Sequence, residues 1–167
     1  MVYYFAYGSN MNHEDFKGRC ASKSNIDLTA KKPVPCTLKN YQLAFNYYST
    51  TRNGGAVNIE KAGGERVEGV LFELSEKELK AIDAKEGYYG PNNQRNFYDR
   101  LEVLVTPKGS TKPKTAVTYI ANKKMVKTSF QPPTKDYLKV IVDGARAYGL
   151  PKAWLRKLEA IQTKDKR

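Results

Sequence analysis

The chain has 167 residues, of which 40% are hydrophobic, and its 29 Lys and Arg against 17 Asp and Glu give a formal net charge of +12. This length fits one domain with a sizeable core, and the sequence has neither a run of about 18 apolar residues nor a basic leader, so we expect no membrane span and no export. Two cysteines (Cys20 and Cys36) and one histidine (His13) cannot supply a zinc or iron–sulfur spacing, so we expect no metal site and reduced thiols in the cytoplasm.

The chain opens on an apolar run that ends in small polar residues, YFAYGSN at positions 4–10. The run predicts a buried strand, and the small residues predict a tight turn at its end. Gly8 permits a close approach of the backbone or a positive φ angle, while Ser9 and Asn10 offer hydrogen-bond donors and acceptors. We interpret this strand end as a ligand-binding loop.

A short helix is predicted next, capped by Asn12 and ending near Gly18. Ser9 and His13 lie four residues apart, which raises the alternative of a hydrolase with a serine nucleophile. The sequence lacks the G-x-S-x-G elbow that presents such a serine, and His13 falls inside the predicted helix. A hydrolase is therefore the weaker interpretation.

Alternating apolar and polar residues predict five further strands between turns rich in Gly, Pro and Asn. With the first strand they form a sheet of about six strands, largely antiparallel or mixed because most of the turns are short. The glycine pairs at 54–55 and 63–64 are predicted as turns, and they lack the spacing of a phosphate-binding loop. The five strands are predicted at 41–47, 56–59, 66–74, 97–106 and 115–120.

The most clearly delimited helix is predicted at 76–86, between the strands predicted at 66–74 and 97–106. Ser75 and Glu78 form the S-x-x-E capping box, and Gly87 follows the last periodic residue as a C-terminal stop. Both ends of this helix are therefore fixed by local sequence.

Glu86 shares the apolar stripe of this helix, because it lies seven residues after Leu79 and four after Ile82. We expect its side chain to point inward, where burial and the negative end of the helix dipole would both raise its pKa. A carboxyl group whose pKa lies nearer to neutral pH is suited to general acid/base catalysis. The alternative is that Glu86 pairs with a basic residue or reaches water at a frayed helix end.

The C-terminal part is predicted to be helical. Thr134, after two prolines, caps a helix whose apolar positions recur until Gly149, with Tyr137 on the apolar stripe. A second helix follows, and residues 163–167 form a short basic tail beyond a single domain of residues 1–162. The apolar residues of the second helix are Leu155, Leu158 and Ile161.

The positive charge is concentrated in the last third of the chain. Residues 1–103 carry 14 Lys and Arg against 13 Asp and Glu, whereas residues 104–167 carry 15 against 4. This +11 region is either a polyanion-binding surface or a solvated lysine face. We favour the solvated face, since the charges are scattered lysines that are not interleaved with aromatic residues, and we expect no nucleic-acid partner.

Three segments in this order resemble the γ-glutamylcyclotransferase family: YFAYGSNM at the start, IDAKEG at the end of the 76–86 helix, and PPTKDYLKVIVDGARAYGLP near the C-terminus. The resemblance runs from Tyr4 to about Ile161. It implies an α+β fold, a small, mixed and largely antiparallel β-barrel flanked by helices, with the substrate held at the barrel mouth.

Members of this family release 5-oxoproline and a free amine or amino acid from a γ-glutamyl amide, by attack of the substrate's own α-amine and without a cofactor. The resemblance implies that Glu86 is the general acid/base. It also implies a small-molecule γ-glutamyl substrate, no membrane partner, and a monomer or homodimer. The substrate-binding residues that it implies are Tyr4, Phe5, Ala6, Tyr7, Gly8, Ser9, Asn10 and Tyr137.

Two alternatives stay open beside this function. A non-catalytic or regulatory binding module of the same fold could use the basic C-terminal third. The leaving group is also open. The Tyr-Gly-Ser-Asn form resembles the branch acting on γ-glutamyl amino acids, but aminoglycoside-tailoring relatives share it, so a γ-glutamyl-amine or an aminoglycoside stays an alternative substrate. Lysines near the mouth would repel a polycationic product, which favours γ-glutamyl amino acids.

Overall fold

The computed structural model describes residues 1–20, 26–29 and 31–164. Its strands form a closed barrel in the hydrogen-bonded order β1-β3-β2-β4-β5. The ladders are antiparallel except between β5 and β1, which pair in parallel at Tyr4 and Val117, so the predicted mixed, largely antiparallel barrel is confirmed. The strands are β1 (Val2–Ala6), β2 (Val34–Ser49), β3 (Gly54–Leu74), β4 (Tyr98–Pro107) and β5 (Lys114–Ala121).

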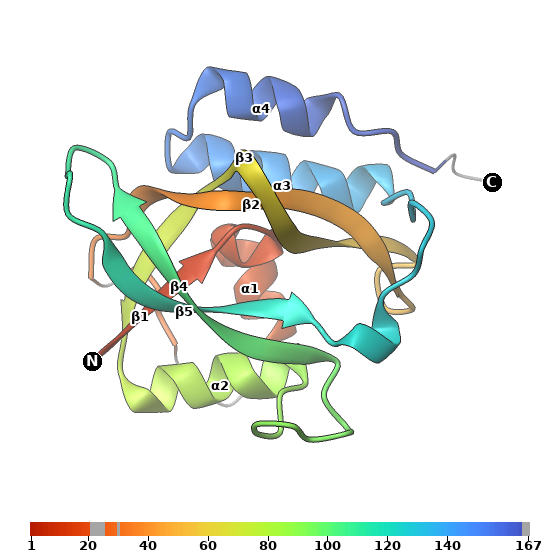
Figure 1. Ribbon diagram of the computed structural model, residues 1–167, viewed down its shortest axis with the longest axis horizontal. Coiled ribbons are helices and arrows are strands. Elements are labelled where there is room, and N and C mark those ends of the chain that lie inside the picture. The colour runs from red at the N-terminus through yellow and green to blue at the C-terminus, as the bar shows by residue number, and fades with distance from the viewer. Residues whose placement is uncertain (21–25, 30, 165–167) are drawn as a thin grey trace.

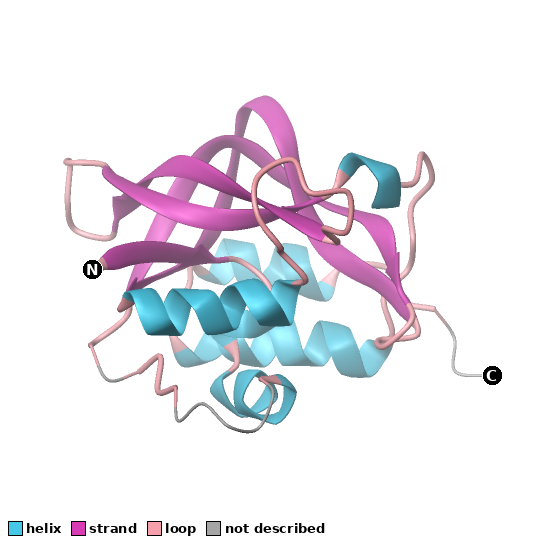
Figure 2. Ribbon diagram, turned by 90° about the horizontal axis from the view of Figure 1, so that it is seen from below, coloured by secondary structure: helices cyan, strands magenta, loops and turns pink. Residues whose placement is uncertain are grey.

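Helices flank the barrel, as predicted. In Figure 1, α3 and α4 lie side by side along one edge of the barrel and α2 lies along the opposite edge. Figure 2 shows the longer helices gathered on one side of the strands. The helices are α1 (His13–Arg19), α2 (Glu76–Glu86), α3 (Lys135–Ala147) and α4 (Lys152–Glu159), with 3-10 turns η1 (Ser9–Met11) and η2 (Lys123–Met125).

The prediction of about six strands is wrong by one, because the segments 56–59 and 66–74 belong to a single long strand, β3. Gly64 has a φ of +83°, and the pairing of β3 with β2 shifts register near Asn40, whose φ is +62°. A bulge of this kind bends a strand without ending it. Gly54 and Gly55 likewise lie inside β3, so neither glycine pair forms the predicted separating turn.

Helix α2 has the predicted bounds and caps. The Ser75 hydroxyl oxygen accepts from the Glu78 backbone N–H at 3.3 Å, and the Ser75 backbone N–H donates to Glu78 Oε2 at 2.6 Å. Gly87 closes the helix with a left-handed φ of +66°. Leu79 and Ile82 are buried, so the last turn of the helix is held firmly against the barrel.

The other predicted helices are confirmed as well. The Asn12 side chain accepts from the Asp15 backbone N–H and caps α1, and its Nδ2 donates to the Val140 carbonyl oxygen of α3 at 3.2 Å. The Thr134 side chain caps α3 in the same way. The predicted tail is described only as far as Lys164, whose backbone N–H donates to the Pro133 carbonyl oxygen, and residues 165–167 lie outside the described residues.

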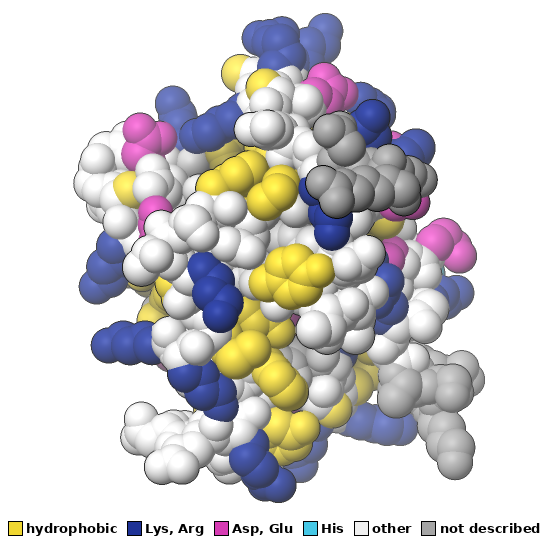
Figure 3. Space-filling view, turned by 90° about the vertical axis from the view of Figure 1, so that its right-hand side faces the viewer, with side chains coloured by type: hydrophobic (Ala, Val, Ile, Leu, Met, Phe, Trp, Pro, Cys, Tyr) yellow, Lys and Arg dark blue, Asp and Glu magenta, His cyan; other side chains and the backbone are white. Residues whose placement is uncertain are grey.

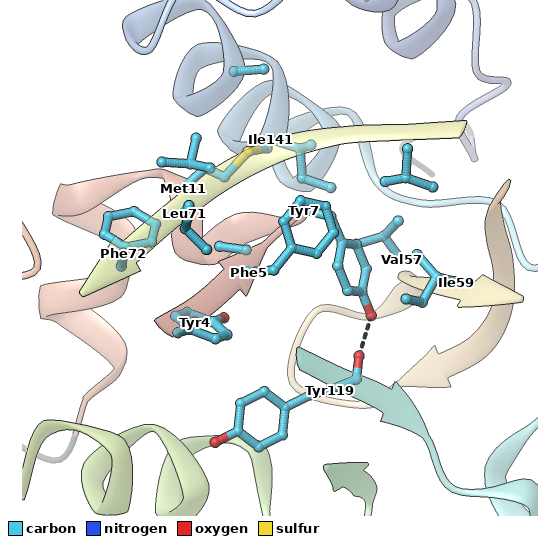
Figure 4. Close-up of a cluster of buried hydrophobic side chains, with 14 of the residues drawn as sticks. Tyr4, Phe5, Tyr7, Met11, Val57, Ile59, Leu71, Phe72, Tyr119 and Ile141 are labelled. Carbon is cyan, nitrogen blue, oxygen red and sulfur yellow. Dashed lines mark hydrogen bonds between the residues drawn. The ribbon is translucent and has the colours of Figure 1, made fainter. Parts of the chain in front are cut away.

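Strand β1 runs through the centre of the hydrophobic core. Figure 4 shows Phe5 among buried side chains from several elements, with Met11 and Ile141 on one side of the strand. Phe5, Met11 and Phe72 are all at most 1% exposed. Burial of each such side chain contributes about 1.5–3 kcal/mol, so the turn that follows β1 is anchored at a well-packed point.

The lysines of the last third lie on separate elements. Lys108 and Lys112 belong to the β4–β5 connection, Lys123 and Lys124 belong to η2, and Lys114 Nζ donates to the Tyr3 hydroxyl at 2.8 Å. On the face shown in Figure 3, Lys and Arg side chains are scattered among uncharged and apolar ones. This distribution fits the solvated surface predicted above. Among the described residues, no helix combines the length and apolar character needed to cross a membrane.

Candidate active site

A small pocket of about 60 Å³ opens where the end of β1, the turn η1 and the last turn of α2 meet. We call it the inner pocket. The residues that line it and were predicted from the sequence are Tyr4, Tyr7, Gly8, Ser9, Asn10, Glu86 and Tyr137.

Two of the predicted substrate-binding residues, Phe5 and Ala6, do not line the inner pocket. They are 0% and 1% exposed, and their side chains pack in the core. The Phe5 carbonyl oxygen accepts a hydrogen bond from the Thr118 hydroxyl at 2.8 Å, which ties β1 to β5. Because both side chains are buried in the core, these two residues hold the strand and leave ligand contact to their neighbours.

Asn10 holds the Glu86 carboxylate in place. Asn10 Nδ2 donates to Glu86 Oε1 at 2.8 Å and to the Tyr4 hydroxyl oxygen at 2.7 Å. Asn10 is 7% exposed, and its Oδ1 is buried without a hydrogen-bond partner among the described residues. Buried polar atoms are nearly always paired in native proteins, so an unpaired acceptor beside a carboxylate points to a ligand that supplies the missing donor.

Glu86 points inward, and it also pairs with a basic neighbour. Lys85 Nζ lies 3.3 Å from Glu86 Oε1, and the two side chains are 11% and 15% exposed. Both the predicted inward orientation and the alternative of an ion pair are therefore present together. In the described part of the chain Oε2 has no hydrogen-bond partner, so this oxygen is free to exchange a proton with a ligand.

Hydrogen bonds fix the hydroxyls of two tyrosines that line the inner pocket, Tyr7 and Tyr119. The Tyr7 hydroxyl donates to the Tyr119 carbonyl oxygen at 2.6 Å, the contact drawn in Figure 4. The Tyr119 hydroxyl donates to Asp83 Oδ1 at 2.6 Å, and Arg100 Nε lies 3.2 Å from the same oxygen. Each of these hydroxyls is committed to a neighbour, which fixes the shape of the pocket.

The tyrosines of the inner pocket stay protonated at neutral pH. Burial raises the pKa of Tyr137 to about 12, and it raises the pKa values of Tyr4 and Tyr98 well above the ordinary tyrosine value. The Tyr137 hydroxyl oxygen accepts from the Val57 backbone N–H at 3.1 Å. A neutral phenol is a poor base, so Glu86 is the group suited to proton transfer in this pocket.

The serine-nucleophile alternative gains no support. Ser9 lines the inner pocket, yet no hydrogen bond joins it to His13 in the described structure, and His13 Nδ1 is buried without a partner. A nucleophilic serine needs a base within hydrogen-bond reach. Within residues 1–20, 26–29 and 31–164, no three His, Cys, Asp or Glu side chains gather as metal ligands would.

Five lining residues were not predicted from the sequence. Most belong to strands whose alternation was recognised, but alternation alone does not distinguish a pocket-facing tyrosine from a core tyrosine. Only barrel closure brings β4 and β5 against β1. These residues are Val57, Lys85, Tyr98, Thr118 and Tyr119.

Comparisons with known proteins find relatives named gamma-glutamylcyclotransferase by both sequence and structure. The model of the AIG2-like family matches residues 66–158. The chain is 30% identical to human gamma-glutamylcyclotransferase over 162 residues, which cover 97% of this chain and 79% of that protein. A solved structure titled gamma-glutamyl cyclotransferase superposes with a TM-score of 0.78 at 28% identity, covering 99% of this chain and 90% of that one. A shorter match, 47% identity over 45 residues and 27% of this chain, covers 29% of the gamma-L-glutamyl-butirosin B gamma-glutamyl cyclotransferase of Niallia circulans.

Proposed function

The chain belongs to the γ-glutamylcyclotransferase family, and we propose that it releases 5-oxoproline and a free amino acid or amine from a γ-glutamyl amide, with Glu86 as the general acid/base. The observation that carries this proposal is the Glu86 carboxylate in the inner pocket, oriented by Asn10 through one oxygen and unpartnered at the other.

Glu86 would act twice in one turnover. The substrate's α-ammonium group is no nucleophile until Glu86 Oε2 removes a proton. The freed amine then attacks the γ-carbonyl carbon and forms the ring C–N bond. As the C–N bond to the leaving group breaks, the proton held by Glu86 passes to the departing amine. The ring nitrogen loses its second proton as well, and this proton leaves with the product amine in its ammonium form. The products are 5-oxoproline and the amine, and no water is consumed.

Asn10 supports the positioning of the α-ammonium group. Its Oδ1 is buried without a partner, while its Nδ2 holds Glu86 at 2.8 Å. An ammonium group that donates to Asn10 Oδ1 would lie beside the base that deprotonates it. Holding the reacting groups close in this way is a large source of rate enhancement in ring closure.

The turn η1 supports binding of an anionic oxygen of the substrate. The first N–H groups of a helical turn, here those of Ser9 and Asn10, have no partner within that turn. Both residues line the inner pocket. We assign to these N–H groups either the α-carboxylate or the oxyanion that develops on the γ-carbonyl.

The proposal needs neither a metal nor a nucleotide and places the protein in a reducing compartment such as the cytoplasm. Cys20 and Cys36 are both buried free thiols, which suits that compartment. Buried apolar residues form one connected cluster that reaches from Tyr4 to Leu158, which supports a single domain over residues 1–162.

Gly8→Ala is expected to weaken substrate binding. Gly8 has a φ of −122°, so a left-handed conformation is not the reason for glycine here. A Cβ at this position would lie 2.6 Å from Val57 Cγ1, and the Val57 backbone N–H holds Tyr137. Crowding of this kind costs about 1–3 kcal/mol, so we expect KM to rise roughly 5- to 100-fold.

Steady-state kinetics would measure this change, with Gly63→Ala as the matched control. A Cβ on Gly63 meets nothing within 4 Å and Gly63 does not line the inner pocket, so that variant should keep the wild-type KM. An unchanged KM for Gly8→Ala would show that the close approach to Val57 does not shape the site.

A product assay tests the proposed function. Purified protein would be given a panel of γ-glutamyl compounds without added metal or nucleotide, and 5-oxoproline would be measured by mass spectrometry. We expect 5-oxoproline and the free amine in equal amounts from at least one γ-glutamyl amino acid. The absence of 5-oxoproline across the whole panel would overturn the proposal.

A further inference from the structure

A second hollow, which we call the outer compartment, adjoins the inner pocket. The two share Ser9, Lys85, Glu86, Tyr98 and Tyr137, and the outer compartment continues toward α1 and the turn between β2 and β3. If the γ-glutamyl group fills the inner pocket next to Glu86, the leaving group has to extend into the outer compartment.

Cationic side chains dominate the outer compartment. Arg19, Arg52 and Lys85 line it, against a single carboxylate, Glu86. None of the three cations belongs to the lysine-rich last third of the chain. The charge that a leaving group meets is therefore set by α1, the β2–β3 turn and α2.

Arg52 is the best-fixed of the three. Its Nη1 and Nη2 donate to the two oxygens of Asp15 at 2.8 and 2.6 Å. The Arg52 side chain is 10% exposed, and its guanidinium carbon lies 4.8 Å from the centre of the Tyr137 ring. A guanidinium has five N–H donors, so the pair with Asp15 leaves donors for a second carboxylate.

Asp15 orients both arginines. Arg19 Nε lies 3.3 Å from Asp15 Oδ1, so one carboxylate faces two guanidinium groups. Partial burial alone would raise the pKa of Asp15, but the hydrogen bonds and charges of Arg52 and Arg19 outweigh it and hold the pKa below its ordinary value. Asp15 stays ionised, and this cluster of three side chains keeps one positive charge in excess.

We propose that Arg52, with Arg19 beside it, binds the carboxylate of the leaving amino acid. The inference rests on the proposed function, and it assigns the preference for γ-glutamyl amino acids to these two arginines in the outer compartment. Guanidinium groups bind carboxylates in a planar, two-bond geometry, and low exposure strengthens such charge-assisted bonds. A cationic leaving group, such as a polyamine or an aminoglycoside, meets an excess of positive charge instead.

Two substrates that differ only in this carboxylate test the inference: γ-glutamyl-alanine and γ-glutamyl-alaninamide. The readout is the ratio of their kcat/KM values within one preparation, because partial unfolding lowers both values and leaves the ratio unchanged. Hydrogen bonds to charged groups predict a wild-type ratio of roughly 10 to 100. We expect Arg52→Gln to reduce this ratio at least about 10-fold and Arg19→Gln to reduce it less.

Two further variants make the test decisive. Arg146→Gln is the matched control, since Arg146 pairs with Glu159 on the surface and lines neither hollow, and its ratio should equal that of the wild type. Arg52→Lys keeps a positive charge beside Asp15 but loses the planar guanidinium that can bind a carboxylate through two hydrogen bonds. If Arg52→Gln does not fold, the ratio is measured with Arg52→Lys instead. We expect its ratio to fall between those of the wild type and Arg52→Gln.

The outcomes separate this inference from the proposed function. In one outcome, substitution of Arg52 leaves the ratio at the wild-type value while both substrates still yield 5-oxoproline. This result overturns the proposed carboxylate subsite but does not contradict the proposed cyclotransferase function. If neither these two substrates nor any other γ-glutamyl compound of the panel yields 5-oxoproline, the proposed function fails and the subsite with it.

Discussion

Glu86→Gln is expected to lower the rate of 5-oxoproline release by roughly 10²–10⁴-fold without disturbing the fold. Glutamine keeps the shape of the side chain, and its amide oxygen can still accept from Asn10 Nδ2, now found 2.8 Å from Glu86 Oε1. The amide cannot take a proton from the α-ammonium group or return one to the departing amine. The loss should therefore appear in kcat more than in KM.

Single-turnover and steady-state rates would be compared with those of Glu76→Gln, which removes an exposed carboxylate from the first turn of the same helix. The control should keep wild-type activity, and both variants should melt near the wild-type temperature. If Glu86→Gln retains near wild-type turnover, the assignment of the general acid/base is wrong.

Gly55→Ala is expected to cause a large loss of stability, because the backbone of another segment occupies the space that a side chain would need. An ideal Cβ on Gly55 would lie 1.7 Å from the Gln131 carbonyl oxygen. The Gly55 backbone N–H donates to the Pro132 carbonyl oxygen at 2.9 Å. This contact docks the segment leading into α3, which carries Tyr137 into the inner pocket.

Overpacking of this severity costs about 3 kcal/mol, and thermal unfolding should show a Tm lower by about 6–12 °C. Gly63→Ala is the matched control within the same strand, since a Cβ there meets nothing within 4 Å and its φ is not positive. Its free energy of unfolding should change by no more than about 0.5 kcal/mol. A Gly55→Ala variant as stable as Gly63→Ala would contradict the close contact between β3 and the segment before α3.

Helix α2 was fully predictable because its signals are local. Ser75, Glu78 and Gly87 fix its ends within one turn each, and the spacing from Leu79 and Ile82 places Glu86 on the inward stripe. The general acid/base candidate could therefore be found by periodicity alone, independently of any resemblance.

Strand β3 could not be predicted as one element. A glycine pair in a sequence usually indicates a turn, but a bulge in a long strand or a close backbone approach also requires glycine. At 63–64 the glycines accompany a bend, and at 54–55 they accommodate residues 131–134. A turn, a bulge and a close backbone approach can be distinguished only by the segments that pack against the glycines, and these segments are far away in the sequence.

The walls of the site were predictable only in part, for the same reason. Residues 4–10 and Glu86 carry local signals, whereas Tyr98 and Tyr119 become pocket residues only through closure of the barrel. Arg52 lies in a connection between strands without any distinguishing pattern, and its partner Asp15 is 37 residues away. Long-range ion pairs of this kind leave no periodic trace in the sequence.

Turnover of γ-glutamyl-alanine in ¹⁸O-labelled water is the most direct test of cyclisation by the substrate's own amine. Intramolecular attack uses no water, so we predict unlabelled 5-oxoproline and an equal amount of alanine, and no turnover of the N-acetylated substrate, whose amine is blocked. Release of glutamate with one ¹⁸O atom in its γ-carboxylate would instead show hydrolysis and contradict the proposed mechanism.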